Sequence, residues 1–133
     1  MQVNNHENET ATSDGCTLVE VHVRDASALA LDWACARITN PQWFDDGLMD
    51  GDPMYMLDMD DGFRYRPSVD ANQAHSLIED AIKSIERLDD GWRAVNMDGY
   101  GFMGNTMLEA VCRGFVFKHS GPFVKVPHAI VSG

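Results

Sequence analysis

The stretch SALALDWACARI, residues 27–38, predicts a helix that is apolar on nearly every side. Ser27 is a residue type favoured at helix N-caps, and Asn40-Pro41 ends the pattern. At helical spacing, one apolar stripe is formed by Leu31, Ala34, Cys35 and Ile38, and the nearly opposite side by Leu29, Trp33 and Ala36. Asp32 and Arg37 are the main polar interruptions. A helix that is apolar all round is covered all round, so we expect cover on both faces.

Two interpretations of the face around Trp33 remain open. In the first, the segment from Pro41 to Arg64 folds back over Trp33, because large apolar side chains usually find cover in their own chain. The segment supplies seven such side chains: Trp43, Phe44, Met49, Met54, Tyr55, Met56 and Met59. In the second, a second copy or a host protein covers Trp33, because Trp and Met suit contact surfaces. The first predicts a monomer, and the second a homodimer or a complex.

The rest of the chain predicts an α+β fold of about four short strands and about three helices. Strands or extended segments are expected at residues 16–23, 63–68, 91–97 and 123–127. Besides the helix at 27–39, a second is expected from Asp70 to about Leu88. A third is expected from Asn105 or Thr106 to about Lys118, with Gly121 as its stop. In the second helix, Glu79 and Lys83 are spaced for an ion pair. We predict one core that contains Leu31, Cys35, Ile78, Ile82, Leu108, Val111 and Phe115.

Length and composition indicate one small domain in a reducing compartment. A chain of 133 residues is long enough to form a core without covalent cross-links. Residues 1–16 are polar and predict a disordered leader, and residues 17–133 a single domain. The three cysteines, Cys16, Cys35 and Cys112, are an odd number, which favours core thiols over a disulfide framework. Residues 1–15 lack the basic start and apolar stretch of a signal peptide, and no later apolar run is long enough for a membrane span, so we expect neither.

The charge of the chain is strongly negative and concentrated in one loop. The net charge is −11, which repels nucleic-acid phosphates and anionic membranes. Residues 45–62 contain seven Asp and no Lys or Arg: Asp45, Asp46, Asp50, Asp52, Asp58, Asp60 and Asp61. These side chains and Trp33 are the candidate residues for binding the basic surface of a partner protein. The alternative is a solvated loop that serves only solubility.

The motif GYGFMG, residues 99–104, matches the G-x-G-x-x-G pattern of dinucleotide-binding loops. No Asp or Glu follows Glu109 to hold a ribose, and the chain is short for a doubly wound sheet. A glycine turn between a strand and a helix is therefore the preferred interpretation. The amides at the start of the third helix are a second candidate site, for a small nucleotide-like anion. Its candidate residues are Tyr65, Trp92, Tyr100, Gly104 and Asn105.

Motifs for metals and catalysis are incomplete. The fragment DMDDG, residues 58–62, places its glycine one position early for a calcium loop, and the twelfth position is Val69. The five histidines lack zinc-ligand spacing, and no triad motif is present. We therefore predict no catalytic, cofactor or metal residue. An enzyme whose catalytic groups meet only in space is the third functional class.

Five blocks in order resemble a family of small bacteriophage proteins. The blocks are ALDWACARI, YRPSVD, GWRAV, G-x-T-x-L-E-A-V-C-R and G-P-F-V-K-V-P, within residues 17–128. They are similar to the proteins labelled NinX, whose domain is called the phage ABA sandwich. The resemblance implies a phage or prophage protein in the host cytoplasm, with a sheet between helical layers and no established activity. After Asp70 the chain departs from the family pattern, which puts in doubt any ligand site built there.

These features predict, first, a non-enzymatic accessory protein that binds a basic host or phage protein, with counter-defence as one possible role. A small-anion binding protein is the second prediction.

Overall fold

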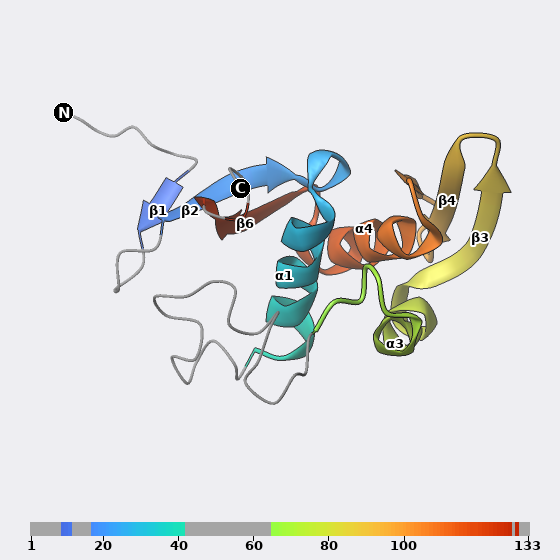
Figure 1. The fold of residues 1–133 in the computed structure, drawn as a ribbon, viewed down its shortest axis with the longest axis horizontal. Helices are drawn as coiled ribbons and strands as arrows, with labels where there is room; N and C mark the ends of the chain where they lie inside the picture. The colour runs from blue at the N-terminus through green and yellow to red at the C-terminus, as the bar shows by residue number, and fades with distance from the viewer. Residues whose placement is uncertain (1–8, 12–16, 42–64, 129, 131–133) are drawn as a thin grey trace.

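The computed structural model describes residues 9–11, 17–41, 65–128 and 130, and it confirms a small α+β fold (Figure 1). The helices are α1 (Ala28–Thr39), α3 (Ala71–Ala81) and α4 (Met107–Ser120), with a 3-10 turn η1 (Val23–Asp25) before α1. The strands are β1 (Glu9–Ala11), β2 (Thr17–His22), β3 (Ile82–Leu88), β4 (Gly91–Asn96), β5 (Gly101–Gly104) and β6 (Phe123–Pro127).

The strands form two separate antiparallel sheets, not the single layer of about four that we expected. One sheet has the order β1-β2-β6. Its strands β2 and β6, which are far apart in the sequence, pair with Val19 opposite Val126 and Val21 opposite Val124. The other is the meander β3-β4-β5. Figure 1 shows α4 running between α1 and the meander. Because α4 packs against α1, α3 and all three meander strands, it links the two halves of the fold.

The capping residues behave as the sequence predicts. The Ser27 hydroxyl accepts a hydrogen bond from the Ala30 amide (3.2 Å), and the Thr106 hydroxyl accepts one from the Glu109 amide (3.2 Å). Gly121, with a φ of 80°, terminates α4. These local bonds satisfy backbone donors that a helix cannot satisfy itself, so the beginnings of α1 and α4 lie where the sequence places them.

The predicted core is mostly confirmed. Leu31, Cys35, Ile82, Val111 and Phe115 belong to one buried cluster, and Ile78 packs against it. Leu108 is the exception: it is half-buried and lies outside the cluster, because the buried side of α4 is centred on Ala110, Val111 and Gly114. Cys35 and Cys112 are buried free thiols.

The prediction of a second helix as far as Leu88 is wrong. α3 ends at Ala81, and Ile82 starts β3, which pairs with β4 through a turn at Asp89-Asp90. The apolar spacing at 78, 82 and 85 fits a helix, but β-branched Ile is also favourable in a strand, and the hairpin partner decides between the two. The expected Glu79–Lys83 pair therefore does not form, because Lys83 lies in the strand.

The structure bears on two further parts of the sequence analysis. Residues Glu9–Ala11, in the segment predicted as a disordered leader, pair with β2 as strand β1. The residues of GYGFMG do not form a phosphate-binding loop, since Gly101–Gly104 is the strand β5 and pairs antiparallel with β4. A dinucleotide fold requires parallel strands with a helical crossover at this point. The glycine interpretation is supported by Gly104, whose Cα lies against the first turn of α4.

Candidate binding site

The carboxylate of Asp32 is the centre of a buried polar cluster on α1. Asp32 is completely buried, and its Oδ1 accepts a hydrogen bond from the Ser68 amide (2.8 Å). Its Oδ2 accepts bonds from the Ser68 hydroxyl (2.8 Å) and from Nε of Arg66 (2.5 Å). A buried charge is tolerated only when it is paired and hydrogen-bonded, and Asp32 meets that condition. The cluster fixes residues 66–68 onto α1.

Burial raises the pKa of the Asp32 carboxyl, and the hydrogen bonds from Arg66 and Ser68 oppose this shift only in part. About two turns further along α1, the hydroxyls of Thr39 and Tyr65 are 3.0 Å apart. Burial raises the pKa of Tyr65 to about 12, so its hydroxyl stays protonated at neutral pH. The Arg66 amide also donates to Oε1 of Gln73 on α3 (2.5 Å).

These contacts have a consequence for the segment 42–64, which lies outside the described residues. The described residues stop at Pro41, just after α1, and resume at Tyr65, whose hydroxyl contacts Thr39 at the end of the same helix. Asp32, Thr39 and Gln73 hold residues 65–68 at this position. We call these residues and their contacts the segment anchor. The anchor therefore holds Tyr65, the first described residue after the Asp-rich residues 45–62, against the end of α1, the helix that precedes them.

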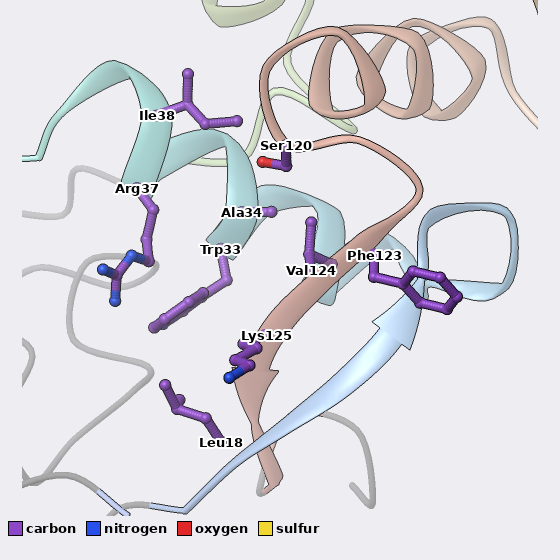
Figure 2. A pocket seen from close by; sticks show the side chains of 9 residues that line it. All are labelled: Leu18, Trp33, Ala34, Arg37, Ile38, Ser120, Phe123, Val124 and Lys125. Carbon is purple, nitrogen blue, oxygen red and sulfur yellow. The ribbon is translucent and has the colours of Figure 1, made fainter. Parts of the chain in front are cut away.

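A pocket of about 260 Å³ lies between α1 and β6. We call it the Trp33 pocket. Its lining residues are Leu18, Trp33, Ala34, Arg37, Ile38, Ser120, Phe123, Val124 and Lys125. Figure 2 shows Trp33, Arg37, Leu18 and Lys125 around one space, whereas the Phe123 ring points away from it. The guanidinium carbon of Arg37 lies 5.3 Å from the centre of the Trp33 ring, a cation–π arrangement.

Of the residues predicted to bind a partner, the seven Asp side chains lie outside the described residues. Trp33 is only 3% exposed in the single chain, so cover within the molecule is the interpretation that its burial supports. Residues 30–36 of α1 are all buried, as expected of a helix apolar all round. The sequence analysis did not predict that Asp32 is a buried acceptor that holds residues 66–68. Its one sequence signal was a charged residue in the middle of an otherwise apolar helix.

The structure brings three of the five residues predicted to bind a small anion close together, because Trp92 in β4 is the register partner of Gly104 in β5 and Asn105 follows Gly104. Tyr65 is buried against Thr39, Trp92 packs beside Arg87, and Tyr100 is exposed next to Phe117. Gly104 and Asn105 do share a pocket of about 300 Å³, which is completed by Arg24, Asp90, Met103 and Arg113. The stacking aromatic that we expected beside the amides is therefore absent from the described lining.

The two arginines of this second pocket already have structural roles. The Arg113 guanidinium donates to the carbonyls of Val23 (3.3 Å), Ala26 (2.7 Å) and Met103 (2.8 Å). Arg24 donates to the carbonyl of Gly101 (3.0 Å) and lies over the Phe102 ring. Together they tie η1 to β5. Carboxylates of Asp90 and Glu109 nearby reduce the attraction of the pocket for an anion.

Within the part of the chain that is described, no group of three His, Cys, Asp or Glu side chains could hold a metal ion. No helix of that part is both long and apolar enough to cross a bilayer. Comparisons with protein-family models, with curated proteins and with solved structures find no match to this chain.

The two carboxyls with shifted pKa values should affect stability in opposite directions. Because burial raises the folded-state pKa of Asp32 above 3.8, its contribution to stability is greatest at low pH and declines as pH rises through that pKa. The hydrogen bond from His119 lowers the pKa of Asp80, so its contribution is present above pH 3.8 and is lost on acidification.

Urea unfolding between pH 3 and 7 tests this pair. In wild type, the Asp32 carboxyl makes the unfolding free energy fall as pH rises above 3.8, and we expect Asp32→Asn to reduce this fall. The Asp80 carboxyl makes the unfolding free energy fall as pH drops below 3.8, and we expect Asp80→Asn to reduce that loss. If the unfolding free energies of both variants had the same pH dependence as each other, the opposite roles assigned to Asp32 and Asp80 would be wrong.

Proposed function

We propose that the protein is a non-enzymatic phage or prophage accessory protein that uses its Asp-rich segment to bind the basic surface of a host or phage protein. The proposal places it in the cytoplasm of the bacterial host. The sequence blocks that resemble NinX proteins support the phage origin. The segment anchor supports a role for the Asp-rich segment, because it holds residues 65–68, which follow that segment, on the helix α1, which precedes it.

The distribution of charge is the observation that carries the proposal. The described residues contain nine Lys and Arg and twelve Asp and Glu, whereas the whole chain contains 10 and 21. Most of the acidic excess therefore belongs to residues outside the described part, and seven of those acids are the Asp side chains of residues 45–62. Basic side chains in the described part are too few to neutralise these carboxylates as well as their own neighbours. A concentrated negative segment accelerates association with a basic surface.

The test removes three charges without changing shape. We expect Asp58→Asn, Asp60→Asn and Asp61→Asn together to melt no lower than wild type, because close like charges repel and contribute little to folding. A partner is first captured from host lysate and purified, and association rates are then measured from about 0.01 to 0.15 M salt, where the Debye length falls from about 30 to 8 Å. The variant should associate more slowly and with a weaker salt dependence.

A matched control removes three exposed charges elsewhere: Glu20→Gln, Asp25→Asn and Asp89→Asn. This control should associate more nearly like wild type, although the net charge is the same in both variants. An unchanged association rate and salt dependence in the Asp58, Asp60 and Asp61 variant would contradict the proposal. It would indicate that the segment serves only solubility. The second proposal, binding of a small anion beside Gly104 and Asn105, would then come first.

A further inference from the structure

The two cysteines in the described part of the chain lie next to each other in the core. Cys35 on α1 and Cys112 on α4 are completely buried free thiols in one cluster of buried residues. The helices α1 and α4 pack against each other, and the Cys112 thiol is close enough to the Cys35 thiol to be its hydrogen-bond partner. The two positions are far apart in the sequence, so the packing of α1 on α4 is what brings the two sulfurs together.

The surroundings of the pair decide how it can react. Leu31, Val111 and Phe115 belong to the same buried cluster, so the thiols lie in an apolar part of the core. Burial and the neighbouring Cys112 thiol raise the pKa of the Cys35 thiol. A cysteine attacks an oxidant as the thiolate. Because Cys35 keeps its proton, we assign the first attack on an oxidant to Cys112.

We propose that Cys35 and Cys112 are a redox-sensitive pair, which hydrogen peroxide converts into a disulfide that cross-links α1 to α4. The Cys112 thiolate attacks one peroxide oxygen, so that an S–O bond forms, the O–O bond breaks and the second oxygen leaves as water with the thiol proton. Cys112 is then a sulfenic acid. The Cys35 sulfur attacks the Cys112 sulfur, and its S–H proton leaves with the hydroxyl as a second water. The two sulfurs lose two electrons in total, and these electrons reduce the peroxide.

The cross-link would strengthen the contact on which the arrangement of the fold depends, because α4 links α1 to the meander β3-β4-β5. A disulfide that closes a long loop restricts the unfolded chain, so the oxidised protein should be the more stable form. Both thiols are buried, so oxidation requires local opening of the core and responds to sustained exposure to peroxide. The inference goes beyond the proposed function and does not depend on the Asp-rich segment.

Peroxide treatment of the folded full-length chain tests the proposal. A Cys16→Ser background removes the third thiol, which lies outside the described residues. Mass spectrometry of the intact protein and of its proteolytic fragments should show the loss of two hydrogen atoms and a Cys35–Cys112 linkage. Circular dichroism during the treatment should show that the chain stays folded. The oxidised protein should melt about 5 °C or more above the reduced protein.

Dithiothreitol separates the cross-link from other oxidation. It reduces a disulfide and leaves methionine sulfoxide unchanged, so the melting temperature should fall again when treated protein is reduced. Cys35→Ala and Cys112→Ala, each in the same background, should form no cross-link within the chain and should gain no stability from peroxide. Failure of either variant to fold leaves the measurement on the intact pair decisive.

The exposed Met97 and Met103 show that the peroxide has acted, because accessible methionines are oxidised to sulfoxides. Two free thiols in protein whose Met97 and Met103 are oxidised would overturn the proposal. Oxidation of one cysteine to a sulfinic acid without a cross-link would also overturn it, as would a Cys35–Cys112 disulfide that leaves the melting temperature unchanged.

Discussion

Gly104→Ala is expected to lower the free energy of unfolding by about 3 kcal/mol or more, a large part of the stability of an ordinary domain. A Cβ at this position would lie 2.5 Å from the Ala110 nitrogen, 2.8 Å from the Thr106 oxygen and 3.0 Å from the Ala110 Cα. All three are backbone atoms of the first turns of α4 or its cap, so no side-chain rotation can relieve the clash. The strand β5 would have to separate from the helix.

Gly101→Ala, in the same strand, is the matched control. Its Cβ would meet the side chain of Arg93, with the nearest atom, Cδ, at 3.1 Å, and that long side chain can move. We expect a change within about 1 kcal/mol of wild type in either direction. Urea unfolding of both variants measures the difference. Equal stability of the two would show that β5 does not depend on close approach to α4.

Asp32→Ala should lower the free energy of unfolding by about 3 kcal/mol. The substitution leaves the Ser68 amide, the Ser68 hydroxyl and the Arg66 guanidinium without their buried acceptor. Loss of one partner from a buried ion pair costs about 3 to 5 kcal/mol, and the lower value applies because the Arg66 side chain is 27% exposed and can reach water. An intact buried ion pair adds little net stability relative to apolar packing of the same site. Removal of one partner is destabilising because the remaining groups stay buried without a partner.

Hydrogen exchange distinguishes local release of the segment anchor from general destabilisation. In Asp32→Ala we expect the Ser68 amide to lose protection more than amides in the meander β3-β4-β5. Asp25→Ala, at an exposed acid on η1, should change stability by less than about 0.5 kcal/mol. A fully protected Ser68 amide in Asp32→Ala would mean that other contacts hold residues 66–68.

The sequence by itself determined the elements that depend on local signals. Ser27 and Thr106 begin helices because their hydroxyls cap nearby amides, and Gly121 ends α4 because only glycine readily adopts its backbone conformation. The all-round apolar pattern of residues 27–38 required a buried helix, and α1 is buried over residues 30–36. These predictions hold because each cause lies within a few residues of its effect.

Only the tertiary structure decided features whose partners are distant in the chain. Residues 82–88 carry a helical apolar spacing, yet they form β3 because β4 provides a hairpin partner. Asp32 is a buried acceptor because Ser68, 36 residues later, supplies two donors to its carboxylate. The Trp33 pocket likewise joins side chains from β2, α1, α4 and β6. No local sequence pattern predicts these long-range contacts. The stability of a strand pair or of a buried charge depends on the residues that the rest of the fold places next to it.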